Sequence, residues 1–190
     1  MTTAQMKPFE RIFSSSLKLR CAQIYGEINM SDVSYLEALF FHFADQGRQR
    51  SKPVTLSIFT GGGSLDASLA LYDLIRAYRE RFPVRALAIG SCMSGGVIVM
   101  QAATERLSYP HSRFMVHELA LIGGNLSLTA QQKEVEEAMR LHRVVRDILF
   151  EHSSVDLEKL RKSHGPVDHY LTAEAALKLG LIDRIVSPES

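Results

Sequence analysis

Three side chains of the sequence, Ser94, His117 and Asp168, are the residue types that hydrolytic enzymes use as nucleophile, general base and orienting acid. A serine hydroxyl is a poor nucleophile alone, but an imidazole can take its proton near neutral pH, and a carboxylate fixes the tautomer of that imidazole. The chemistry would be acyl transfer through a covalent serine intermediate. Spacing alone is weak evidence, because the seven histidines and many carboxylates of the chain permit other such triples.

Two glycine-rich turns could supply the backbone donors that this chemistry needs. Residues 60–64 read TGGGS, and Ser94 is followed by Gly95 and Gly96. The N–H groups of Gly63 and Gly95 would hold the oxyanion of a tetrahedral intermediate, and each such donor is typically worth about 100 to 1,000-fold in rate. A phosphate-binding loop is excluded, because no Gly-Lys-Ser/Thr follows and the G-x-G-x-x-G spacing is absent. The simpler alternative is a pair of turns that only connect core elements.

The elements around these turns predict crossover units on a mostly parallel sheet. Residues 54–59 alternate as a strand does, the glycine turn follows, and apolar residues at helical spacing continue to about residue 81. The same order recurs with a strand over residues 84–89, the turn at Ser94 and an apolar helix. Strand, turn and helix twice in succession favour an α/β fold, with Ser94 at a helix start where the dipole favours a developing anion.

The base and the acid are expected at the ends of further elements. A short strand is predicted over residues 113–117, so that His117 lies where it ends, at an edge that commonly faces a site. Asp168 falls on a loop, before a helix over residues 173–179 that Thr172 would cap. A common edge of the sheet could therefore collect all three side chains.

The N-terminal part is predicted as a leader followed by the start of one domain. Residues 1–16 suggest a flexible leader, and residues 17–190 a single domain. A strand is expected over residues 17–25, followed by a helix that Ser31 or Asp32 would cap.

A long amphipathic helix is expected over residues 129–151. Thr129 and Gln132 have the spacing of a capping box at its start. A helix of this length in a small domain tends to protrude or to pack against a neighbour.

Composition excludes several classes of protein. The 190 residues, 46% of them hydrophobic, can bury a full core without disulfides. With 22 basic and 21 acidic residues, the chain offers no electrostatic case for binding nucleic acid or an anionic membrane. No segment approaches a membrane span, and no signal peptide is expected. Cys21 and Cys92 lack metal-ligand spacing, so we expect reduced core residues of a cytoplasmic protein without a metal site.

Four segments in order along the chain resemble the proteolytic subunit of the Clp protease, a self-compartmentalising serine peptidase of the fold shared with crotonases. The resemblance covers about residues 17–186. The segments are IFTGGGSLDASLALYD (residues 58–73), IGSCMSGG (89–96), SRFMVH (112–117) and DHYLTAEAALKLGLID (168–183). They are similar to the family's INSPGGSVTAGxxIYD, IGxAASMG, SRxMIH and DxFxSAxEAxxYGLID.

The resemblance implies the same site residues as the chemistry. On these motifs the nucleophile falls on Ser94, the base on His117, the acid on Asp168, and the oxyanion donors on Gly63 and Gly95.

The resemblance also implies a fold of repeated β-β-α crossover units with a protruding handle, about residues 119–151. A substrate strand would lie beside residues 119–127, with Gly62, Gly123 and Gly124 as substrate-binding residues. Main-chain pairing of this kind would give broad specificity.

The implied function is that of a serine endopeptidase subunit of an ATP-dependent protease, which cleaves unfolded polypeptides through an acyl-enzyme on Ser94. Its implied partners are further copies in a heptameric ring or stacked double ring, a paralogous subunit in a mixed ring, and an AAA+ unfoldase. ATP would be used by the unfoldase, since this chain has no nucleotide motif, and no cofactor is expected.

Departures from the family pattern keep two alternatives open. Gly61 stands where the family has proline, and Glu118 and Leu119 stand where it has Gln-Pro. One alternative is a catalytically silent or partner-activated ring subunit. The other is a crotonase-type acyl-CoA enzyme, for which Glu105 is the nearby candidate acid/base.

Overall fold

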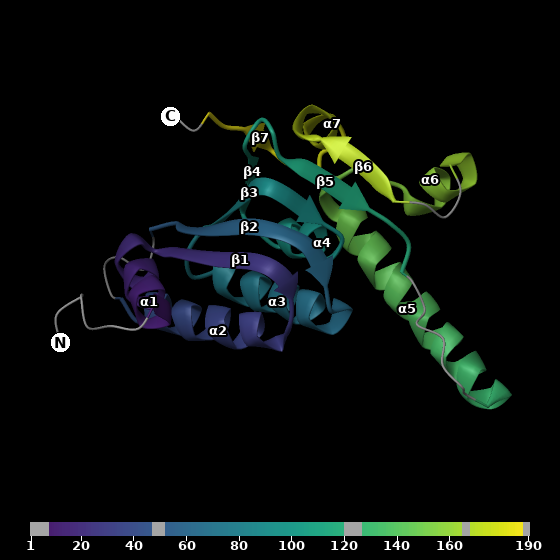
Figure 1. Ribbon diagram of the computed structural model, residues 1–190, viewed down its shortest axis with the longest axis horizontal. Helices are drawn as coiled ribbons and strands as arrows, with labels where there is room; N and C mark the ends of the chain where they lie inside the picture. The colour runs from purple at the N-terminus through teal and green to yellow at the C-terminus, as the bar shows by residue number, and fades with distance from the viewer. Residues whose placement is uncertain (1–7, 47–51, 120–126, 165–167, 188–190) are drawn as a thin grey trace.

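The fold is built on a single mostly parallel sheet (Figure 1). The computed structural model describes residues 8–46, 52–119, 127–164 and 168–187. In chain order the elements are α1 (Pro8–Leu19), β1 (Cys21–Ile28), α2 (Met30–Ala44), β2 (Val54–Gly63), α3 (Leu65–Arg79), β3 (Val84–Met93), α4 (Gly95–Gln101), β4 (Glu105–Ser108), β5 (Arg113–Val116), α5 (Leu128–His152), α6 (Leu157–His164), β6 (His169–Thr172), α7 (Ala173–Lys178) and β7 (Arg184–Ile185).

The order of the strands explains how distant segments reach one edge of the sheet. Strands β1, β2, β3, β4 and β7 lie side by side in this order, and each neighbouring pair is parallel. Beyond the part of β3 that pairs with β4, the strand pairs in parallel with β5, which pairs antiparallel with β6. Parallel neighbours need crossover connections, which α2, α3 and α4 provide between β1 and β4. The predicted α/β class with crossover units is confirmed.

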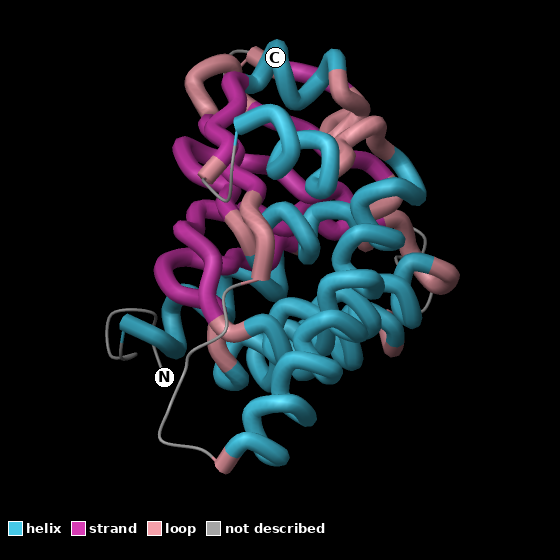
Figure 2. The backbone as a smooth tube through the Cα atoms, turned by 90° about the vertical axis from the view of Figure 1, so that its right-hand side faces the viewer, coloured by secondary structure: helices cyan, strands magenta, loops and turns pink. Residues whose placement is uncertain are grey.

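Alternating and helical patterns of apolar residues create the core between the sheet and its helices. In β2 the inward positions, among them Leu56 and Ile58, are fully buried. They face the buried stripes of α2 and α3, which include Phe40 and Leu71. Figures 1 and 2 show these helices along one side of the strands. The close packing of this buried layer gives the turns at the ends of β2 and β3 a rigid support.

Helix α5 projects from the body, as Figure 1 shows. Its 25 residues make it about 37 Å long at the usual rise per residue. Its C-terminal part is packed on the core through Val145 and Leu149, and Arg76 of α3 pairs with Glu151 at 2.6 Å. Met139, nearer the projecting end, is 58% exposed. The long helix predicted over residues 129–151 therefore lies within α5, and its C-terminal part is the part packed on the core.

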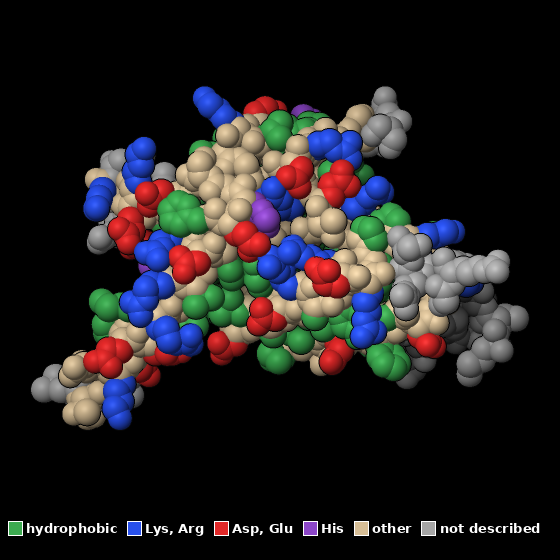
Figure 3. Space-filling view, turned by 180° about the vertical axis from the view of Figure 1, so that it is seen from behind, with side chains coloured by type: hydrophobic (Ala, Val, Ile, Leu, Met, Phe, Trp, Pro, Cys, Tyr) green, Lys and Arg blue, Asp and Glu red, His purple; other side chains and the backbone are tan. Residues whose placement is uncertain are grey.

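Acidic and basic side chains are interspersed over the face shown in Figure 3. Neither sign dominates this face, which agrees with the net charge of +1 for the whole chain.

The N-terminal segment differs from its prediction. The sequence predicts a leader over residues 1–16 and a strand from residue 17, whereas α1 is helical through Leu19. Two tertiary contacts hold its end: Ser16 Oγ lies 3.2 Å from the hydroxyl of Tyr35, and the guanidinium of Arg20 lies over the ring of Phe43. Residues 1–7 lie outside the described ranges.

Two helix starts also differ from their predictions by one to three residues. Helix α2 is capped by Asn29 instead of Ser31 or Asp32, and the Asp32 carboxylate accepts the Asn29 N–H to complete a capping box. Helix α5 is capped by Ser127, whose hydroxyl accepts the N–H of Ala130. Each observed cap is of a residue type preferred at that position and lies immediately before the first helical residue. Because neighbouring polar residues fit the same capping pattern, the sequence alone did not distinguish the actual cap from them.

Candidate active site

Ser94 lies on a strained turn between β3 and α4. Its backbone has φ of 50° and ψ of −116°, a conformation that residues other than glycine rarely adopt. The N–H of Ser94 donates to the carbonyl of Met115 at 2.8 Å, which ties the turn to β5. A serine on a sharp turn from strand to helix presents its hydroxyl away from the backbone, as hydrolase nucleophiles require.

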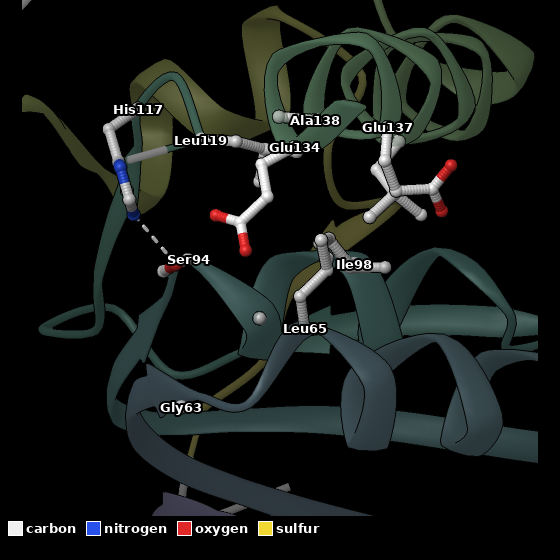
Figure 4. A pocket seen from close by; sticks show the side chains of 11 residues that line it. Gly63, Leu65, Ser94, Ile98, His117, Leu119, Glu134, Glu137 and Ala138 are labelled. Atoms are coloured by element: carbon white, nitrogen blue, oxygen red, sulfur yellow. Dashed lines mark hydrogen bonds between the residues drawn. The ribbon is translucent and has the colours of Figure 1, made fainter. Parts of the chain in front are cut away.

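The pairing of β3 with β5 brings His117 to Ser94. Met93 and Met115 are the last register partners of the two strands, so the residues that follow them emerge at the same edge of the sheet. Ser94 Oγ and His117 Nε2 are 2.8 Å apart, within hydrogen-bond distance (Figure 4). Two of the three side chains singled out in the sequence are therefore in contact.

The tautomer of His117 follows from its second hydrogen bond. Nδ1 lies 2.6 Å from the backbone carbonyl oxygen of Glu118. Because a carbonyl oxygen only accepts, Nδ1 carries the hydrogen, and Nε2 offers its lone pair to the Ser94 hydroxyl. This is the arrangement that a general base needs.

Asp168 is near in register but does not pair with His117. Val116 and His169 are the last register partners of the antiparallel β5–β6 pair. Asp168, the residue before His169, therefore lies across from His117, the residue after Val116. Its side chain is exposed, however, and accepts a hydrogen bond from the Tyr170 hydroxyl at 3.3 Å. Among the described residues no hydrogen bond joins the Asp168 carboxylate to the imidazole. The assignment of Asp168 as the acid stays a prediction.

The glycine turns pack against the nucleophile. Gly62 has φ of 110°, and a Cβ there would lie 2.7 Å from the Cβ of Ser94. Gly63 and Gly95 line the cavity that contains the Ser94 hydroxyl. Gly95 is the first residue of α4, so its N–H has no partner within the helix. The place of these glycines is compatible with the predicted oxyanion donors.

A cavity of about 480 Å³ opens beside the Ser94–His117 pair. Its walls are mostly aliphatic and come from α3, α4, α5 and the residues after β5. The aliphatic side chains are Leu65, Ile98, Leu119, Ala138 and Leu141. An apolar cavity with a few polar groups at one end is the usual form of a substrate pocket.

Two carboxylates of this cavity, Glu134 and Glu137, are not among the residues predicted from sequence. They lie three positions apart on α5, hence on one face of the helix, a spacing that could have drawn attention to them. Gly123 and Gly124, predicted to bind substrate, lie outside the described residues.

Rival chemistries find little support at this site. Burial raises the pKa of the Cys92 thiol, so this neighbour of the turn is no thiolate nucleophile. Glu105, the candidate of a crotonase-type enzyme, is paired with Arg85 and Arg184, and it does not line the cavity at Ser94. Within the described ranges, no three His, Cys, Asp or Glu side chains are grouped closely enough to hold a metal ion.

In the part of the chain that the structure describes, none of the helices is sufficiently long and apolar to cross a bilayer.

A serine–histidine pair on a strand-to-helix turn, beside an apolar cavity, is a site of the serine-hydrolase class. Comparison with protein families agrees, because the model of the Clp protease family matches residues 5–189. The chain belongs to the Clp protease family.

Individual relatives match from three quarters to nearly all of the chain. The ATP-dependent Clp protease proteolytic subunit 3 of Synechococcus sp. (strain CC9605) is 31% identical over 188 residues, which cover 97% of this chain and 90% of the relative. The ATP-dependent Clp protease proteolytic subunit of Borreliella afzelii (strain PKo) is 32% identical over 190 residues, with coverage of 95% and 91%. Subunit 2 from Prochlorococcus marinus (strain NATL2A) is 33% identical over 144 residues, with coverage of 74% and 70%.

Proposed function

We propose that this chain is the serine endopeptidase subunit of an ATP-dependent Clp-type protease and cleaves unfolded polypeptides through an acyl-enzyme on Ser94. The observation that carries the proposal is the 2.8 Å contact of Ser94 Oγ with His117 Nε2, in a tautomer set by the Glu118 carbonyl. Membership of the Clp protease family supports it.

In the acylation step, Ser94 Oγ attacks the scissile carbonyl carbon while His117 Nε2 takes the hydroxyl proton. The oxyanion that forms is held by the N–H groups of Gly63 and Gly95. When the C–N bond breaks, the imidazolium returns the proton to the leaving amine, and an ester remains on Ser94. Water then attacks the ester carbonyl carbon while the imidazole takes its proton, and the imidazolium returns that proton to Ser94 Oγ as the ester bond breaks and the acid product leaves. Asp168 serves as the acid. Its side chain turns toward His117 Nδ1, and its carboxylate then stabilises the imidazolium.

The peptide is held as an extended strand. Its main chain runs along Gly62 and the segment of residues 119–127, with Gly123 and Gly124 beside it. Hydrogen bonds to a peptide backbone do not depend on side chains, so they suit an enzyme that accepts many unfolded sequences.

The assembly is a ring of copies, heptameric or doubled, with a paralogous subunit in a mixed form and an AAA+ unfoldase that delivers substrate in the cytoplasm. The names of the relatives, which describe proteolytic subunits of ATP-dependent proteases, support an assembly of separate subunits. ATP is spent by the unfoldase, and the acid–base chemistry of this chain uses no cofactor.

A second candidate function is a ring subunit that is silent until a partner completes its site. The observation in its favour is Asp168, which is exposed and bonded to Tyr170 at 3.3 Å instead of His117. Without its acid, a serine–histidine pair keeps only a small part of its rate.

Labelling with a fluorophosphonate distinguishes the two candidates. The adduct is detected by intact mass and mapped by peptide sequencing, with His117→Ala protein as the control. Labelling of Ser94 that depends on His117 supports the peptidase. Absence of labelling, in a sample shown separately to be assembled, contradicts it and favours the silent or partner-activated subunit.

A further inference from the structure

The wall of the cavity formed by α5 carries two carboxylates, Glu134 and Glu137, beside otherwise aliphatic side chains. No lysine or arginine is among the described residues that line this cavity. Residues 120–126, outside the described ranges, contain no charged residue in the sequence. The cavity next to the nucleophile therefore has an excess of negative charge at one wall.

The two carboxylates differ in what they contact. Glu137 is engaged by Arg140, whose Nε and Nη2 donate to it at 2.8 and 2.6 Å, so its charge is already balanced. For Glu134, no ion pair or hydrogen bond of its side chain is found among the described residues. In Figure 4 its carboxylate points from α5 toward the side of the Ser94–His117 pair, whereas that of Glu137 points away. Glu134 is thus the carboxylate available to a ligand in the cavity.

The chemistry of the walls defines the side chain that would fit. A stem of three or four methylene groups can lie against Leu65, Ile98 and Leu141, and a cationic end can reach the Glu134 carboxylate. Lysine and arginine have this form, with an apolar stem and a charged head. A neutral aliphatic side chain would fill the same walls but leave Glu134 to water, and an acidic side chain would be repelled.

We propose that Glu134 is a specificity-determining residue, and that the cavity selects lysine or arginine on the acyl side of the scissile bond. The inference rests on the proposed function, because it takes Ser94 as the atom that attacks the carbonyl next to this side chain. The contact lies at a partly solvated site, so the preference over a neutral side chain of equal shape is about three- to tenfold.

The test compares arginine with citrulline, which has the same shape but no charge. Fluorogenic peptides that differ only in this residue, placed before the scissile bond, give two values of kcat/KM. The arginine/citrulline ratio is expected to be about five for the wild type and about one for Glu134→Gln. Glu136→Gln is the matched control, since Glu136 lies on the same helix, is exposed and does not line the cavity. Its ratio stays at the wild-type value.

A charge reversal extends the series. Glu134→Lys is expected to disfavour arginine and to accept glutamate at the same position. Because Glu134 is exposed, neither substitution disturbs the core.

A binding arm keeps the inference separate from the proposed catalysis. In Ser94→Ala protein, which turns nothing over, product-like peptides ending in arginine or citrulline are titrated and followed by NMR. Tighter binding of the arginine peptide, lost in Glu134→Gln, supports the inference even if no peptide is hydrolysed. Equal affinities, or no binding of either peptide, overturn it. Absence of any Ser94-dependent hydrolysis by the wild type, with selective binding intact, overturns the proposed function alone.

Discussion

Two aspartates each stand immediately before one of the short C-terminal strands, and the structure uses them differently. Asp183 precedes β7 and accepts hydrogen bonds from the backbone N–H and the Nε of Arg106, at 2.7 and 3.1 Å. Asp168 precedes β6, is exposed, and among the described residues accepts a hydrogen bond only from the Tyr170 hydroxyl, at 3.3 Å. A carboxylate that accepts several hydrogen bonds from buried groups stabilises the fold, whereas an exposed carboxylate can still turn toward a catalytic partner.

The partner of Asp183 is itself held on several sides. Arg106 is buried, and its Nη1 donates to Gln101 at 2.8 Å and to the carbonyl of Gly180 at 2.9 Å. Burial raises the pKa of Asp183, but the hydrogen bonds from Arg106 outweigh that effect, so its pKa lies below the ordinary value. This network ties β4 to the end of the chain. Among the described residues, no such network restrains Asp168.

The largest effect is expected from Ser94→Ala, which tests the site that Asp168 would serve. Loss of the nucleophile should lower kcat/KM for a fluorogenic peptide by about 10⁴-fold or more. The melting temperature should hardly change, because among the described residues the Ser94 hydroxyl has a hydrogen-bond partner only in His117. Full activity in this variant would show that the nucleophile assignment is wrong.

Asp168→Asn tests whether Asp168, unlike Asp183, has a catalytic role. If the carboxylate stabilises the imidazolium of His117 in the working enzyme, kcat should fall by about 10² to 10⁴-fold. Stability should stay within about 0.5 kcal/mol, since the side chain is exposed. Steady-state kinetics and urea unfolding measure the two quantities. An unchanged kcat would mean that the Glu118 carbonyl alone orients the base.

Arg106→Ala tests whether the network of Arg106 and Asp183 stabilises the fold. The buried guanidinium is lost and its acceptors, Asp183 and Gln101, lose a donor, so unfolding should become easier by about 2 to 3 kcal/mol. Urea denaturation gives this value, and the kcat of the folded fraction should remain near wild type. Exposed Arg113→Ala, on β5, is the control expected to change little. A stability equal to wild type would refute the structural assignment.

The pH dependence of stability sharpens the same contrast. Because the pKa of Asp183 is lowered on folding, its contribution is present above the unfolded-state pKa of about 4 and is lost as pH falls toward the lower folded value. The stability difference between wild type and Asp183→Asn should therefore shrink below about pH 4. Urea midpoints between pH 3 and 7 test this, and a constant difference would contradict it.

The smallest effect is expected from Tyr170→Phe. The substitution removes the hydroxyl that donates to Asp168 at 3.3 Å, a long hydrogen bond on an exposed side chain. We expect kcat to change by less than about threefold, because such a contact contributes little. A strong rise in kcat would instead show that Tyr170 withholds the acid from His117.

Much of the fold was predictable because its patterns are local. The alternation in β2, the apolar stripe of α3 and the long stripe of α5 follow the periods of a strand and a helix. The N-terminal helix was not predictable in this way. Its end is held by the contacts of Ser16 with Tyr35 and of Arg20 with Phe43, both in α2. A local sequence pattern does not contain such tertiary contacts.

The sequence by itself determined the candidate residues of the site, Ser94, His117 and Asp168, through their residue types, the ends of predicted elements and the resemblance of four segments to the Clp protease family. Only the tertiary structure decided which of them meet. The β3–β5 register sets the 2.8 Å contact, and the orientation of exposed Asp168 is set by its own neighbours. The cause is physical: backbone pairing places Cα atoms, whereas side-chain torsions respond to local donors and to solvent. Glu134 likewise lines the cavity because of the tertiary structure, which packs α5 against the residues around Ser94.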